Sequence, residues 1–93
     1  MKLLVISCSL NPESRSRLLA KEIIKYLGQD ELEVDAMDLR KIQIPFCDGT
    51  GSKFSDTVKD INERIKSSNG IVLSVPIYNF DVNAATKNLI ELT

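Results

Sequence analysis

Hydroxyl and amide side chains gather in one polar segment near the amino terminus. Residues 7–16 follow the apolar run 3–6 and carry four serines, an asparagine and an arginine. If this segment leads from a strand into a helix, its free N–H groups and the positive end of the helix dipole favour an anion, and hydroxyls add donors without adding charge. The segment therefore predicts a phosphate site. The alternative is that Ser14 or Ser16 only caps the helix.

A second segment with binding potential is Pro76-Ile77-Tyr78-Asn79-Phe80, which interleaves two aromatic rings with polar groups. Tyr78 and Phe80 would wall a flat, π-rich ligand, and Asn79 would fix its polar edge. The alternative is that both rings fill a corner of the core.

Short apolar runs alternate with longer amphipathic ones, which predicts the order β-α-β-α-β-α. The apolar runs 3–6 and 71–75 are typical of strands covered on both faces. Leu32, Val34 and Ala36 alternate with acidic residues, which predicts an edge strand. Helical spacing covers 17–27, where Leu19, Ile23 and Leu27 share one stripe before Gly28, and also 58–65 and 83–92.

This alternation predicts an α/β fold of the doubly wound, parallel type, with three strands in the order 2-1-3 and three helices in one domain, 1–93. Both polar segments then lie at the carboxyl ends of adjacent strands, where such sheets bind ligands. The third strand has the composition of a strand with two neighbours, yet no fourth strand follows it. We therefore expect the first part of a larger sheet.

Composition excludes several functions. The 93 residues hold 12 basic and 13 acidic side chains, no histidine and a net charge of -1, which disfavours nucleic-acid binding and leaves no histidine for catalysis or metal binding. We expect no metal site. The longest apolar run is far too short to span a membrane. Only Cys8 and Cys47 are present, without a disulfide pattern or a leader, which predicts a cytoplasmic location.

The two polar segments also carry a family resemblance. Residues 9–20 resemble the first loop and helix of the NADPH-dependent FMN reductases, which are flavodoxin-like proteins, and residues 74–80 with 86–88 resemble their second loop and following helix. The resemblance implies that the FMN phosphate is held by Ser9, Ser14, Arg15 and Ser16, and that Asn11 also belongs to the cofactor-binding residues. It further implies that the ribityl chain and flavin ring face Pro76, Ile77, Tyr78, Asn79 and Phe80. Three positions depart from the family pattern: Asn11, Ser16 and Ile77 stand where a basic residue, asparagine and glutamate are frequent.

The resemblance implies an NAD(P)H-dependent FMN oxidoreductase, in which hydride passes from NADPH or NADH to FMN and on to a flavin, quinone or similar small acceptor. No side chain receives a catalytic role, because the cofactor performs the chemistry. Family members continue through further strands and a third flavin loop, so the resemblance covers an N-terminal half. A complete site is then expected to need a second copy or a complementing chain at the edge of the third strand.

Two other functions remain open. A non-catalytic half-domain would act as a dimeric flavin-binding, phosphate-binding or assembly module. Alternatively, Cys8 followed by Arg15-Ser16 resembles the Cys-x5-Arg-Ser loop of low-molecular-weight protein tyrosine phosphatases, although six residues separate Cys8 from Arg15 here.

Overall fold

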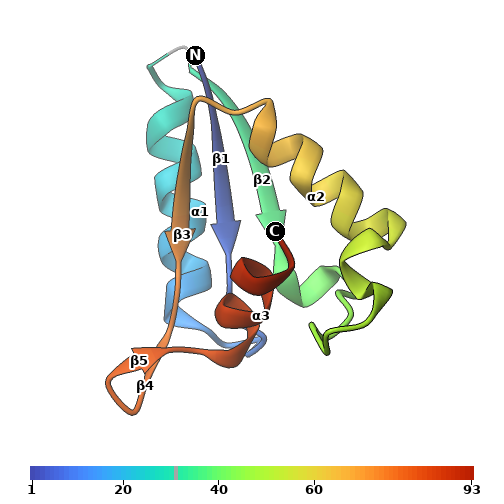
Figure 1. Ribbon diagram of the computed structural model, residues 1–93. Coiled ribbons are helices and arrows are strands. Elements are labelled where there is room, and N and C mark those ends of the chain that lie inside the picture. Colours follow the sequence, from blue (N-terminus) through green and yellow to red (C-terminus); the bar gives the residue numbers. More distant parts are fainter. Residues whose placement is uncertain (31) are drawn as a thin grey trace.

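The computed structural model describes residues 1–30 and 32–93, apart from the side chains of residues 53 and 54 (Figure 1). Strands and helices alternate as the sequence predicts, with two short 3-10 helices and a small hairpin added. The elements are β1 Lys2–Ser7, α1 Arg15–Gly28, β2 Glu33–Asp38, η1 Leu39–Lys41, η2 Gly51–Phe54, α2 Asp56–Lys66, β3 Gly70–Ser74, β4 Ile77–Tyr78, β5 Asp81–Val82 and α3 Ala84–Leu92.

The main sheet is parallel and has the strand order β2-β1-β3. Val5 on the central strand lies opposite Ala36 on β2 and Val72 on β3, and this register brings the carboxyl ends of all three strands to one edge. Helix α1 covers one face, and α2 and α3 lie on the other (Figure 1). The predicted doubly wound α/β fold with three strands and three helices is confirmed.

Alternation along β1 divides its buried side chains between the two faces. Leu4, Ile6 and Cys8 belong to a cluster with Met37, Leu39, Ile61 and Leu89, so they face α2 and α3. Val5 is also fully buried and points the opposite way, toward α1. The cluster fixes the end of β1, from which the first polar segment starts.

Helix α1 differs from the prediction in its bounds and in its inward face. It begins at Arg15, because Ser14 caps it, and runs through Gly28 to a cap at Gln29. The predicted inward stripe is partly wrong, since Leu19 is 55% exposed and Ala20 is the buried residue instead. The reason is that the sheet ends at β3, so the flank of α1 beyond β3 has no cover among the described residues.

In the part of the chain that the structure describes, both outer strands of the sheet have a free edge. The predicted edge position of β2 is confirmed. Its predicted apolar face is partly wrong, because Ala36 is exposed and Met37, which pairs with Ile6, enters the core instead. On β3, Ile71 and Leu73 are 46% and 40% exposed, although their neighbours on β1 are buried. An apolar strand is thus left half-covered. Among the described residues, no helix has the length and apolarity that crossing a membrane requires.

Candidate functional site

The first polar segment folds into a compact turn through its own side chains. Ser9 Oγ accepts a hydrogen bond from the Asn11 amide at 3.2 Å, and Asn11 Oδ1 accepts one from the Glu13 amide at 3.0 Å. The Asn11 carbonyl accepts a third from the Ser14 amide at 3.2 Å. These local bonds are of the kind that asparagine and serine form in turns, and they bring the chain directly to the start of α1.

Ser14 is the N-cap of α1, because its Oγ accepts a hydrogen bond from the Arg17 amide at 3.2 Å. Ser14 therefore does cap the helix, and this bond leaves its predicted role at a phosphate site untested. The same Oγ lies 2.7 Å from Ser16 Oγ, so the cap also brings two hydroxyls together at the positive end of the helix. Arg15, the first residue of α1, is exposed beside them.

The donors left over in this segment fit a phosphate. Among the hydrogen bonds of the described residues, the backbone amides of Ser9, Leu10, Arg15 and Ser16 have no acceptor. The first turn of α1 contains no acidic residue, and the carboxylate of Glu13, just before it, is exposed. Unpaired amides, hydroxyls and a guanidinium at a helix N-terminus are the donor set that holds phosphate in α/β folds.

The second polar segment forms a hairpin that the sequence did not predict. Strands β4 and β5 pair antiparallel, and Asn79 and Phe80 are the two residues of the turn. Both have positive φ, 50° and 66°, as the type I′ turn of a two-residue hairpin loop requires. Figure 1 shows the hairpin projecting from the carboxyl end of β3, and Lys87 Nζ on α3 pairs with the carboxylate of Asp81 on β5, 2.8 Å apart.

The aromatic rings of the hairpin do not enter the core. Tyr78 is 55% exposed, Phe80 is fully exposed, and Ile77 beside them is also exposed. Pro76, between β3 and the hairpin, is half-buried. The alternative in which these rings fill a corner of the core is therefore wrong, and both remain free to contact a ligand.

Hydrogen bonds join the two segments at one edge of the sheet. The Cys8 amide donates to the Ser74 carbonyl at 2.9 Å, and Ser74 Oγ donates to the Ser16 carbonyl at 2.5 Å. Asn83 Nδ2 donates to the Cys8 carbonyl at 2.8 Å. Sequence reasoning did not identify Ser74 or Asn83 as part of the site. Ser74 could have been identified, because it is a single polar residue at the end of an apolar strand.

Cys8 lacks the surroundings of a phosphatase nucleophile. Its side chain is fully buried in the core cluster, and Sγ donates to the Ile6 carbonyl at 3.8 Å. Burial raises the pKa of the Cys8 thiol, against a smaller opposing effect of the Thr86 hydroxyl. A nucleophilic cysteine needs a lowered pKa and access to its substrate, so the structure argues against the phosphatase alternative.

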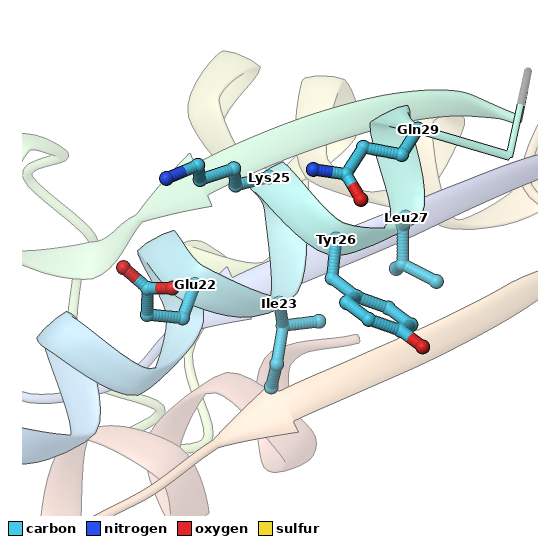
Figure 2. Close-up of a pocket in the computed structure, with 6 residues that line it drawn as sticks. All are labelled: Glu22, Ile23, Lys25, Tyr26, Leu27 and Gln29. Atoms are coloured by element: carbon cyan, nitrogen blue, oxygen red, sulfur yellow. The ribbon is translucent and has the colours of Figure 1, made fainter.

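Other parts of the described surface offer less chemistry. A hollow of about 460 Å³ lies along the C-terminal half of α1, where Ile23, Tyr26 and Leu27 extend toward β3 and the polar chains of Glu22, Lys25 and Gln29 complete the lining (Figure 2). It lies at the opposite end of α1 from the polar segment. Within residues 1–30 and 32–93, no group of histidine, cysteine or acidic side chains is arranged to hold a metal ion.

Comparison with known proteins agrees with this geometry. The chain is 28% identical over 98 residues to an iron-sulfur flavoprotein of Methanocaldococcus jannaschii, 27% identical over 95 residues to an NAD(P)H-dependent FAD/FMN reductase of Geobacillus thermodenitrificans, and 30% identical over 92 residues to an NADPH azoreductase of Bacillus sp.. These alignments cover 98%, 99% and 98% of this chain but 51%, 51% and 49% of the relatives, so the chain spans about half their length.

The sequence profile of one family, described as NADPH-dependent FMN reductase, matches residues 1–93, and so includes both polar segments and the strands that position them. With its parallel sheet in the order β2-β1-β3 and two polar segments joined at the carboxyl edge, the chain belongs to the NADPH-dependent FMN reductase family.

Proposed function

We propose that this chain binds FMN at the carboxyl ends of β1 and β3 and serves an NAD(P)H-dependent flavin oxidoreductase. One observation carries the proposal: the unpaired amides and hydroxyls at the start of α1 lie at the same sheet edge as a hairpin with two exposed aromatic rings. Ser74 and Asn83, which flank the hairpin in sequence, hold the two parts together by hydrogen bonds to the Ser16 and Cys8 carbonyls. A phosphate-bearing ligand with a flat ring system matches both halves of that arrangement.

In this proposal the phosphate lies against the first polar segment. The Ser9 hydroxyl, the one proton left over by the paired Ser14 and Ser16 hydroxyls, and the free amides around them donate to its oxygens, and the Arg15 guanidinium balances its charge. Asn11 shapes the segment through its two turn bonds rather than by adding charge.

The ring system lies against the hairpin. Tyr78 and Phe80 supply aromatic surface, the Asn79 amide supplies hydrogen bonds to the polar edge, and Pro76 and Ile77 line the approach from β3. FMN held there would supply hydride-transfer chemistry between a reduced nicotinamide and a small acceptor such as a flavin or a quinone. The chain's own residues hold and orient the cofactor, and none of them is assigned a catalytic role. The family description favours NADPH over NADH as the reductant.

We also propose that a second copy of the chain, or a complementing chain, covers the free edge of β3. The strand contains no charged residue or proline, the usual protections of an exposed edge. If two copies pair antiparallel about Val72, Ile71 of each faces Leu73 of the other, so four half-exposed apolar side chains cover one another.

Both cysteines are free, consistent with the cytoplasmic location that we propose.

The edge proposal is tested by light scattering on Leu73→Lys and on the control Ile90→Lys, which places the same charge on an exposed position of α3. We expect Leu73→Lys to prevent self-association and Ile90→Lys to leave it intact. A wild-type chain that is monomeric at all concentrations, with or without FMN, would contradict pairing of two copies. A dimer that binds FMN but does not oxidise NADPH would favour the non-catalytic binding module.

The flavin proposal is tested by titrating FMN into the purified chain and recording flavin fluorescence. Ser14→Ala removes the N-cap of α1 together with a proposed phosphate ligand. Ser55→Ala is its matched control, because Ser55 caps α2 in the same way, with Oγ accepting from the Val58 amide at 3.3 Å. Each variant should lose about 1 kcal/mol of stability, but only Ser14→Ala should weaken FMN binding. Equal FMN affinity in both variants would remove Ser14 from the site.

A further inference from the structure

A buried polar bridge lies between the two segments. Asn83 is 7% exposed and Thr86 is 1% exposed. The Thr86 hydroxyl donates to Asn83 Oδ1 at 2.5 Å, and Asn83 Nδ2 donates to the Cys8 carbonyl at 2.8 Å. Because a carbonyl can only accept, the Asn83 NH2 group faces Cys8, and the Thr86 hydroxyl then donates to the oxygen end of the amide. Both polar ends of the Asn83 side chain therefore have a partner within a buried region.

The bridge joins Cys8, which precedes the turn 9–14, to Asn83, which follows the hairpin 77–82. Cys8 is followed directly by Ser9, the first residue of the phosphate-binding turn in our proposal. Asn83 follows β5 directly and is the N-cap position of α3. Its side chain makes no capping bond to that helix, although capping is the usual use of asparagine there. The side chain is instead used for a contact 75 residues away along the sequence.

The contact sets the direction of a backbone donor. In a trans peptide the C=O and N–H groups point to opposite sides, and the described residues contain no cis peptide. When Asn83 holds the Cys8 carbonyl, it therefore also fixes the Ser9 N–H, which points away from Asn83 and has no acceptor among the described residues. The Cys8 amide is held as well, by the Ser74 carbonyl at 2.9 Å. The chain thus enters the turn in one fixed orientation.

We propose that Asn83 is a positioning residue that couples the turn 9–14 to the hairpin 77–82, and that Thr86 holds its amide in the required orientation. This inference rests on the proposed FMN site. An anion bound at the turn then restricts the hairpin, because Cys8 and Asn83 move together. The flavin ring consequently meets a hairpin that the phosphate has already ordered, which lowers the ordering cost of binding.

Four variants test the coupling. Asn83→Ala removes the bridge, Thr86→Val removes only the hydroxyl at nearly constant shape, and Thr86→Ser restores a hydroxyl. Asn88→Ala is the matched control, since Asn88 lies on the same helix and also bridges backbone groups far away in sequence. Its Oδ1 accepts from the Cys47 amide at 2.8 Å and its Nδ2 donates to the Pro45 carbonyl at 2.9 Å, away from both segments.

The measurement is amide hydrogen exchange of residues 9–14 and 77–82, without ligand and with inorganic phosphate, followed by FMN titration. Phosphate should slow exchange of the hairpin amides in the wild-type chain, in Thr86→Ser and in Asn88→Ala. That response should be absent in Asn83→Ala and reduced in Thr86→Val, and FMN should bind roughly tenfold more weakly to Asn83→Ala.

The two proposals fail in different ways. If the wild-type chain binds neither phosphate nor FMN, the proposed function is wrong, and ligand-free exchange decides the coupling. The coupling is supported if, without ligand, Asn83→Ala speeds amide exchange in both the turn 9–14 and the hairpin 77–82 while Asn88→Ala does not. If phosphate protects the hairpin equally in the wild-type chain and in Asn83→Ala, or if Asn88→Ala behaves like Asn83→Ala, the coupling is overturned. Should Asn83→Ala fail to fold, the contrast between Thr86→Val and Thr86→Ser gives the same decision.

Discussion

Phe80 combines a strained backbone with a fully exposed ring, and replacing it with glycine should separate these two properties. Its φ of 66° lies in the left-handed region, which costs a residue with a Cβ about 1–2 kcal/mol. Glycine adopts that conformation freely but loses about 0.5–1 kcal/mol more backbone entropy on folding. The ring contributes no burial, because it is fully exposed. Phe80→Gly should therefore stabilise the chain by about 0.5–1 kcal/mol.

Phe80→Ala is the matched control, because it removes the ring but keeps the Cβ and hence the strain. Its stability should stay within about 0.5 kcal/mol of the wild-type value. If the ring contacts the flavin, both variants should bind FMN about two- to tenfold more weakly, the worth of one aromatic contact. Urea unfolding and FMN titration on the three proteins measure the two effects independently.

The outcomes refute separate steps of the reasoning. A Phe80→Gly chain no more stable than Phe80→Ala would show that the turn stores no strain at this position. Unchanged FMN affinity in both variants would remove the Phe80 ring from the site. A stabilised Phe80→Gly chain with weaker FMN binding would show that the strained turn is kept for the contact its ring makes with the ligand.

Two further predictions concern single groups. Iodoacetamide should label Cys47 and spare Cys8 in the folded chain but label both in urea, as seen by mass spectrometry; labelling of Cys8 under native conditions would contradict its burial. Arg64 donates two hydrogen bonds to the Asp35 carboxylate, at 2.8 and 2.7 Å, and thereby lowers the pKa of Asp35 in the folded chain. The unfolded chain therefore protonates Asp35 more readily than the folded chain, and stability falls as the pH drops below about 4. Asp35→Asn should cost about 1 kcal/mol at neutral pH and flatten this acid slope in urea unfolding; a slope as steep as that of the wild-type chain would refute the assignment.

The sequence predicted the sheet order and the edge role of β2 because local patterns decide both. Continuous apolar runs differ from alternating ones, and helices between strands impose parallel pairing. The inward face of α1 was harder to predict, since Leu19 and Ala20 are both apolar and only the extent of the sheet decides which one is buried. That extent depends on β3 being an outer strand, which is a property of the whole fold.

The predicted site residues lie at one edge of the sheet, but the contacts that hold them together were not predictable from spacing. The hairpin escaped prediction because its turn contains no glycine: Phe80 adopts the conformation that usually indicates one. Asn83 escaped because asparagine before a helix reads as a cap, and its actual partner is a carbonyl at the other end of the chain. Bonds between distant segments leave no periodic signal in a sequence.

Ser14 shows that capping a helix and binding an anion are compatible uses of one hydroxyl. As a cap, Ser14 Oγ uses a lone pair to accept the Arg17 amide, and its proton is not consumed by that bond. Ser14 and Ser16 share a single hydrogen bond at 2.7 Å, so one hydroxyl donates to the other and the second proton is left for another acceptor. The cap therefore fixes Ser14 in place and leaves a donor at the positive end of α1. The structural role and the proposed phosphate contact reinforce each other, because an oriented hydroxyl loses less entropy on binding than a free one.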